Sequence, residues 1–341
     1  MKIVLKIFIP LCVLSFIAFG ISVMFLGTQP KNADAAAEEL VVDSASTYDI
    51  TDSFTSIKAD IGAYKLTIKP WSKDSTQVMV LGDKTDRIKV SVSGDRLNIR
   101  SDWNWENNWN WNWVKNLFDG SSFSTEVTLK IPDKTYEQVM MYVGAGQLVA
   151  DGVQAKDVYL DVGAGSLTYT QPLKFQADHF SADVSAGKLV VGNMAAGSYE
   201  VDVSAGDANI YGLTGSGSVD ISAGSATLQF NELSEECDVD VSAGEVTLDI
   251  PEDTSAKFIC DKSAGDIRIM VADENRHADD GETISINGGK TDVKLSVSAG
   301  SITVLNSTAS VVEQNSSAVA TTGIYTEAEA IEENYAETVK E

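Results

Sequence analysis

The chain has 341 residues, with 25 basic and 50 acidic side chains and a formal net charge of −25. The acidic excess is concentrated in residues 140–304, which carry 9 basic and 26 acidic side chains, whereas residues 1–139 carry 15 and 17. A surface this acidic repels phosphate backbones, so nucleic acid is excluded as an expected partner, while cations and cationic polymers are allowed.

Residues 1–30 are predicted to form a signal-anchor transmembrane helix. Lys2 and Lys6 precede an uncharged run, residues 7–27, that is long enough to cross a bilayer. The basic flank is expected to stay in the cytoplasm, which makes the protein single-pass in the cell membrane with its bulk extracytoplasmic. The alternative is a cleaved signal peptide, because residues 33–37 contain small-residue cleavage patterns, and the bulk would then be secreted.

Residues 31–47 are interpreted as a linker, and residues 48–139 as a β-rich N-terminal portion that caps the rest of the fold. Period-two alternation in residues 88–94 and 127–132 is typical of strands. Residues 61–66 resemble a degenerate copy of a repeat that recurs in residues 140–304.

A tryptophan-rich segment interrupts this portion at residues 102–123. Residues 102–113 read DWNWENNWNWNW and hold five of the six tryptophans of the chain. Three roles remain open: a cap over the end of the fold, a stacking platform for envelope sugars, and an anchor at the membrane interface. The candidate binding residues are Trp103, Trp105, Trp109, Trp111 and Trp113.

A tetrapeptide recurs eight times in residues 140–304, six times as V-S-A-G or V-G-A-G and once each as I-S-A-G and K-S-A-G. Its final glycines lie 18–22 residues apart, except for a last gap of 35. So short a period indicates a solenoid in which each repeat buries its apolar face against its neighbours. The eight glycines are Gly146, Gly165, Gly187, Gly206, Gly224, Gly244, Gly265 and Gly300.

Apolar residues alternate on both sides of each glycine, which predicts two short strands per repeat joined by a bend that the glycine permits. The fold class is therefore all-β, a parallel β-solenoid with coils of about 20 residues. Eight coils spaced by roughly 4.8 Å would make a rod on the order of 40 Å long. The 35-residue gap is expected to hold a projecting loop or hairpin, and residues 305–341 a disordered acidic tail.

The ordered series of turns resembles the bacterial "putative adhesin" domain family of unknown function, membrane-anchored β-solenoid repeat proteins. The features that match are the strand at residues 128–134 and the ladder of V-S-A-G turns ending near residues 287–289. The resemblance spans residues 48–304 and implies a β-solenoid on the cell surface. It implies no catalytic or binding residues, and the family name rests on fold alone.

Aspartates precede the glycines by four residues and are predicted to point outward in one column. Neighbouring carboxylates about 5 Å apart repel, and a divalent cation such as Ca²⁺ would relieve the repulsion. In the alternative reading, each aspartate caps its turn through backbone N–H groups. No metal site or cofactor is predicted, with Ca²⁺ left open, and the candidates are Asp183, Asp202, Asp220 and Asp240, in a column that also holds Asp161 and Asp261.

Two histidines and two cysteines lie within the repeats. His179 is expected near a turn and His277 in the projecting loop, both as solvated side chains. Cys237 and Cys260 occupy inward positions of coils taken to be adjacent, where their Cα atoms would be roughly 8 Å apart, beyond disulfide reach. Two buried thiols are therefore predicted.

The sequence favours a non-enzyme, because its coils are short and its few histidines have no nucleophile context. The leading hypothesis is a non-enzymatic cell-surface interaction or adhesin-like scaffold of the bacterial envelope, with cell-wall glycan or another envelope protein as partner. The first alternative is an accessory or sensor protein in envelope-stress signalling. The second is a carbohydrate-active β-helix enzyme.

Overall fold

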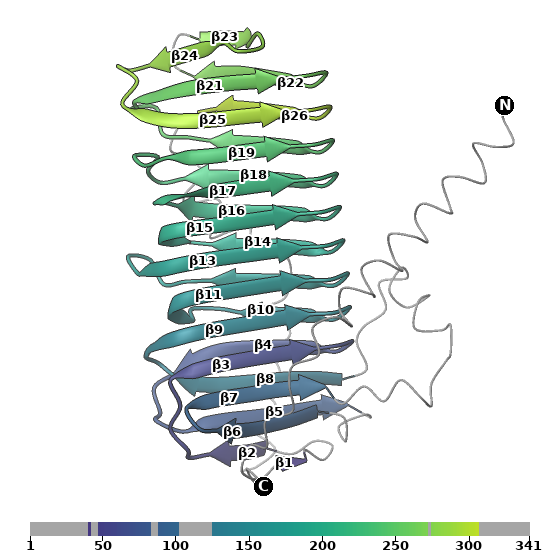
Figure 1. The fold of residues 1–341 in the computed structure, drawn as a ribbon. Helices are drawn as coiled ribbons and strands as arrows, with labels where there is room; N and C mark the ends of the chain where they lie inside the picture. The colour runs from purple at the N-terminus through teal and green to yellow at the C-terminus, as the bar shows by residue number, and fades with distance from the viewer. Residues whose placement is uncertain (1–39, 42–46, 83–87, 102–124, 272–273, 307–341) are drawn as a thin grey trace, which may run out of the picture.

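The computed structural model describes residues 40–41, 47–82, 88–101, 125–271 and 274–306. Every strand within them belongs to one of two 13-stranded sheets that face each other across an apolar core (Figure 1). The fold is all-β, as predicted, and the described residues contain no helix. Most neighbouring strands are parallel, because each coil contributes one strand to each sheet.

Sheet A is built, in spatial order, from β1 (Leu40–Val41), β6 (Ile88–Ser93), β7 (Arg96–Ser101), β3 (Ser56–Ile61), β9 (Thr135–Val143), β11 (Gln154–Val162), β13 (Gln176–Val184), β15 (Ala195–Val203), β17 (Ser216–Ile221), β19 (Cys237–Val241), β25 (Thr291–Val297), β21 (Ala256–Lys262) and β24 (Thr283–Ile286).

Sheet B contains β2 (Thr47–Ile50), β5 (Thr76–Gly82), β8 (Thr125–Pro132), β4 (Lys65–Trp71), β10 (Gln147–Ala150), β12 (Ser166–Thr170), β14 (Lys188–Gly192), β16 (Asp207–Leu213), β18 (Ser225–Phe230), β20 (Glu245–Asp249), β26 (Ser301–Leu305), β22 (Asp266–Val271) and β23 (Glu274–His277).

Alternate side chains of each strand fill the space between the sheets. In β11, for example, Val158, Leu160 and Val162 are buried, while Tyr159 and Asp161 point away from the core. Because the pairing keeps equivalent residues in register from coil to coil, the inward residues stack in continuous apolar columns. This stacking is what a single repeat lacks, so the coils are stable only together.

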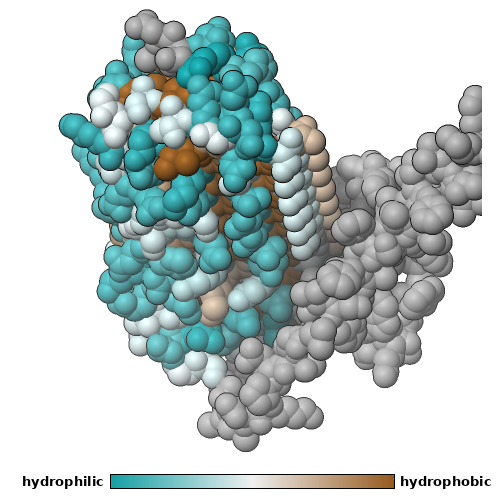
Figure 2. Space-filling model, turned by 45° about the horizontal axis from the view of Figure 1, so that its top comes forward, coloured by the Kyte–Doolittle hydropathy of each residue, from teal (hydrophilic) through white to brown (hydrophobic). Residues whose placement is uncertain are grey.

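The Ser-Ala-Gly turns stack along one edge of the rod, where Figure 2 shows a straight column of small residues. Each turn donates backbone N–H groups to the turn of the preceding coil: Ser185 N to Val162 O over 2.9 Å and Ala186 N to Gly163 O over 2.7 Å. The degenerate copy joins this ladder, because Gly144 N donates to Ile61 O over 2.8 Å. The turn N–H groups are therefore satisfied by backbone carbonyls of the neighbouring coil.

The repeat glycines are required for a different reason from the predicted bend. None of the eight has a positive φ. A Cβ added at Gly206 would instead lie closer than 3.0 Å to the backbone oxygen of Gly187 and to a methyl group of Val184. The constraint is the close approach of successive coils, which leaves no space for a side chain.

The stacking order departs from the chain order near the C-terminal end. β25 and β26, which come last in the sequence, lie between β19–β20 and β21–β22 (Figure 1). The long gap between the last two glycines is expected to hold a projecting loop or hairpin, but it contributes β22, β23, β24 and β25 to the two sheets. β23 pairs antiparallel with β22, and β24 with β21, at the edges of the sheets, where they cover the end of the rod.

The N-terminal end is arranged in the same way. β3 and β4, the first full coil of the chain, lie one layer inside the stack, between β7–β8 and β9–β10. β1, β2, β5 and β6 pair antiparallel beyond them. Both ends of the rod are therefore closed by short antiparallel strands, an arrangement that limits edge-to-edge association.

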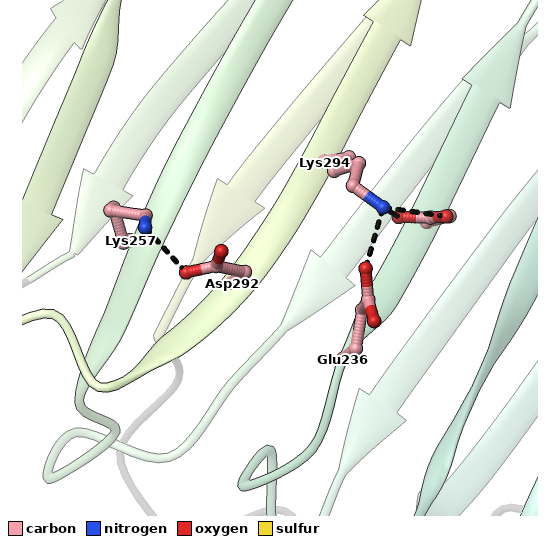
Figure 3. A network of polar contacts seen from close by, with 5 residues as sticks. Glu236, Lys257, Asp292 and Lys294 are labelled. Atoms are coloured by element: carbon pink, nitrogen blue, oxygen red, sulfur yellow. Dashed lines mark hydrogen bonds and ion pairs between the residues drawn. The ribbon is translucent and has the colours of Figure 1, made fainter.

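Ion pairs connect the inserted strand β25 to the coils on both sides of it. Lys294 in β25 contacts Glu236 over 2.5 Å and Asp238, its register partner in β19, over 3.1 Å. On the other side of the same strand, Asp292 contacts its register partner Lys257 over 2.7 Å (Figure 3). These cross-strand pairs help to select the register of a coil that no short connection holds in place.

Cys237 and Cys260 are buried free thiols, as predicted, but their coils are not adjacent. The inserted strand β25 separates them, and Cys237 pairs in register with Val293 whereas Cys260 pairs with Leu295. Burial, the largest cause, raises the pKa of both thiols to about 11.

We expect neither of these thiols to react with an aqueous thiol reagent in the folded chain, because the reactive thiolate is suppressed. A chain lacking residues 1–37 should therefore release less than one equivalent of chromophore until denaturant is added. Fast reaction of one equivalent under native conditions would show that the coil around that cysteine opens.

Several sequence-based expectations lie outside the described residues: the predicted anchor, the tryptophan segment and the acidic tail. Within the part of the chain that the structure describes, no helix is long and apolar enough to span a membrane.

Lys262, which interrupts the inward valine column, lies in β21 and is only partly buried. Its backbone N–H donates to the carboxylate of Asp280 over 3.1 Å.

Candidate functional site

The outer face of sheet A carries a straight row of carboxylates. Register pairing places the aspartates of β11, β13, β15, β17 and β19 directly beside one another, as the column predicted. Asp261 does not follow Asp240, because the inserted strand brings Ser296 between them. The Asp row is defined as Asp161, Asp183, Asp202, Asp220 and Asp240.

These five carboxylates accept no hydrogen bond and form no ion pair within the described residues. The expected turn-capping role is therefore wrong, since the turn N–H groups bond to backbone carbonyls of the preceding coil. Neighbouring aspartates of the row lie one coil apart, roughly 4.8 Å, so each carboxylate has a like charge on at least one side. The row is a line of negative charge that no basic side chain of the described residues contacts.

The environment of the Asp row raises the pKa of several of its carboxyl groups. Burial, with smaller contributions from Asp183 and Asp60, raises the pKa of Asp161 to about 6. Burial also raises the pKa of Asp183, and burial followed by neighbouring carboxylates raises the pKa of Asp202 and Asp220. Losing a proton from the row is therefore unfavourable, and a bound cation would oppose that effect.

Aromatic side chains lie beside the N-terminal half of the Asp row. Tyr142 occupies the row position between Asp60 and Asp161. Tyr159 stands two residues before Asp161 on the same face, and its ring centroid lies 5.5 Å from that of His179. Tyrosine rings next to carboxylates are a combination that attracts organic cations.

One cation of the chain already occupies such a position. The ammonium group of Lys58 lies 5.2 Å from the centroid of the Tyr142 ring. Tyr159 has no such ammonium group over its ring within the described residues. The Tyr159 ring therefore offers the same kind of contact that the Tyr142 ring makes with Lys58. A partner would have to supply the cation.

The described residues contain no group of three or more His, Cys, Asp or Glu side chains that could hold a metal ion together. The Asp row is linear, so each pair of neighbours would offer few oxygen ligands to one ion, whereas Ca²⁺ takes six to eight. The Ca²⁺ alternative for Asp183, Asp202, Asp220 and Asp240 stays a prediction.

A sequence model of a protein domain matches residues 54–305, which include every described strand except β1 and β2. The chain belongs to the Toastrack DUF4097 family. This confirms the resemblance drawn from the turn series. No curated protein matches the chain.

Several solved structures match the chain at low sequence identity. A "putative adhesin" from Bacteroides fragilis is 13% identical, covers 78% of this Toastrack chain and 99% of its own, and has a TM-score of 0.47. A "putative cell adhesion protein" from Clostridium sporogenes is 13% identical over 77% and 100%, with a TM-score of 0.27. A "putative lipid binding protein" from Parabacteroides distasonis is 12% identical over 77% and 97%, with a TM-score of 0.44.

Both histidines lie in strands, not in the predicted turn and projecting loop, although His277 is exposed as predicted. His179 lies in the middle of β13 on the outer face of sheet A, where its Nδ1 is 3.1 Å from Ser198 Oγ. His277 ends the edge strand β23, and its Nδ1 is 2.8 Å from a carboxylate oxygen of Asp266. The two rings belong to different sheets of the Toastrack rod and share no site.

The Toastrack fold should become less stable as pH rises through the range in which Asp161 ionises. Its pKa is about 6 in the folded chain against an ordinary 3.8, so between these values the folded chain holds a proton that the unfolded chain has lost. Stability therefore falls as pH rises from about 4 to 6, by on the order of 1 kcal/mol after allowance for solvent screening.

Asp161→Asn should remove this part of the pH dependence and stabilise the protein at neutral pH. Denaturant unfolding at about pH 5 and about pH 7.5 measures both effects, with Asp253→Asn as an exposed control outside the row. Parallel pH profiles for the wild type and Asp161→Asn would show that the row does not destabilise the fold.

Proposed function

We propose that this Toastrack protein is a non-enzymatic interaction scaffold of the bacterial envelope, whose outer sheet A face binds cationic groups of a partner. The observation that carries the proposal is the Asp row: five carboxylates in register without a counter-charge from the described fold, next to the rings of Tyr142 and Tyr159. The rod presents this face as a flat and repetitive surface. Such a surface suits a partner with repeated cationic groups better than a single small substrate.

A charged face of this kind acts mainly through long-range attraction and fast association. The binding energy per contact is modest, since exposed ion pairs contribute about 1 kcal/mol or less each. Several contacts made together along the rod would give a useful affinity. The proposal also includes an extracytoplasmic, membrane-anchored location, for which the N-terminal apolar run of the sequence is the support.

The experiment is sedimentation of residues 38–341 with isolated cell-wall sacculi and, separately, with liposomes, with and without Ca²⁺. The row variant carries Asp161→Asn, Asp183→Asn and Asp202→Asn. The control variant removes the same charge at exposed acids outside the row, through Glu235→Gln, Glu245→Gln and Asp253→Asn. A further variant with serine at the five tryptophans tests the other candidate surface.

We expect the row variant to lose sedimentation with envelope material while the control variant keeps it. Loss only in the folded tryptophan variant would move the interaction to residues 102–123. Equal sedimentation of all variants would contradict the proposed role of sheet A. Release by Ca²⁺ would indicate that the ion competes with the partner for the Asp row.

A further inference from the structure

The last part of the rod is a structural unit of its own. β21 pairs with β25 and β24, and β22 pairs with β26 and β23. Among the described strands, neither β21 nor β22 pairs with the coils that precede it in the sequence. The six strands of residues 256–305, named here the end module, are therefore joined to the remaining stack through β25 and β26 only.

The segment that connects the stack to the end module is hydrogen-bonded to the module. The side-chain amide of Asn287 donates to the carbonyl oxygens of Glu252 and Thr254, over 3.1 and 3.0 Å. The Ser255 hydroxyl donates to the carbonyl of Asn287 over 2.7 Å. Residues 252–255 are thus tied to the turn that leads into β25, and the pivot of any movement lies between β20 and this segment.

The junction with the stack closes a longer loop than the junctions between consecutive coils from β9–β10 to β19–β20. Consecutive coils of the ladder are about 20 residues apart, whereas β19 and β25 pair across more than 50 residues. Closing a longer loop costs more conformational entropy. The ion pairs of Lys294 with Glu236 and Asp238 are exposed, so they compensate for this only in part.

We propose that the end module detaches from the stack as one unit, and that the β19–β20 edge it uncovers is a docking site for the end module of a second copy. The β19–β20 edge already pairs with the end module within one chain, so it is complementary to the same module of a second copy. Asp238 faces Lys294, Val239 faces Leu295, and Val246 faces Ile302. Each copy carries both halves of this junction, so every hydrogen bond and apolar contact made within one chain can also form between two chains.

Two variants of residues 38–341, each with one cysteine added to the buried Cys237 and Cys260, test the exchange in a chain that keeps every described strand. One carries Asp238→Cys and the other Lys294→Cys, two positions that are direct neighbours across the junction and within disulfide reach. They are distinguished by size, mixed as folded proteins and oxidised mildly. A double variant with both cysteines in one chain shows that this disulfide can close.

We expect a disulfide-linked heterodimer to accumulate severalfold above either homodimer. The matched control mixes Ser181→Cys with Glu200→Cys, register partners in β13 and β15, where the ladder has short connections. That pair should give no heterodimer above the homodimer level. The proposal is overturned if the Asp238→Cys and Lys294→Cys mixture gives none while the double variant closes its own disulfide, or if both mixtures cross-link equally.

Discussion

Gly146→Ala is expected to destabilise the rod by about 3 kcal/mol, because the added methyl group collides with backbone that cannot move aside. Its Cβ would lie closer than 3.0 Å to the carbonyl oxygen of Tyr64 in the neighbouring coil. That oxygen already accepts the N–H of Gln147 over 3.0 Å, so relieving the collision would break a hydrogen bond of the turn ladder. Denaturant unfolding of the purified domain measures the loss.

Gly144 provides the matched control in the same turn. A Cβ there would meet its nearest neighbour, the oxygen of Gly62, at 3.4 Å, an ordinary contact, and the later repeats carry serine at this position. Gly144→Ser should change the free energy of unfolding by less than about 0.5 kcal/mol. Equal destabilisation by the two substitutions would mean that the turn needs backbone freedom at both glycines, and that crowding between coils is not the cause.

A chain that stops after residue 289 is expected to lose the order of β21–β24 although it keeps their sequence. β25 and β26 are the strands through which that region reaches the stack, so their removal leaves β21 and β22 without parallel partners among the described strands. It also uncovers β19 and β20 as edge strands with unpaired backbone groups, which should promote association. Hydrogen exchange of residues 256–286 should show little protection.

A chain that stops after Asn306 is the control for this truncation, since it keeps every described strand. It should retain native protection in β21–β24. If the shorter chain also keeps β21–β24 protected, those strands dock onto β19 and β20 directly, and the coils would then stack in chain order.

The repeat pattern was sufficient to predict the strand pairs, the inward columns and the register of the Asp row, because these follow from one repeat and its period. It was not sufficient to predict the order of the coils. All coils share the same apolar alternation and the same turn, so any of them could pack against any other. The observed order brings together charge pairs such as Lys294 with Asp238 and Lys257 with Asp292, which involve residues far apart in the sequence.

The glycine requirement was misread for a related reason. A bend is a property of one repeat, whereas the crowding at Gly206 comes from Gly187 and Val184 in the preceding coil. The aromatic part of the candidate site was missed because Tyr159 and His179 have no fixed offset from the repeat glycines. The available signal was the position of Tyr159 two residues before Asp161, which places both on one face of a strand.

The most direct test of the interaction face is a calorimetric titration of residues 38–341 with a short lysine-rich peptide at low and at high salt. We predict binding that weakens with salt, is largely lost in the row variant and survives in the control variant of equal charge. Tyr159→Ala should weaken binding by about 1 kcal/mol through its ring, whereas Tyr211→Ala on sheet B should not. Equal binding by the row and control variants would show that net charge alone attracts the peptide, and would contradict a specific face on sheet A.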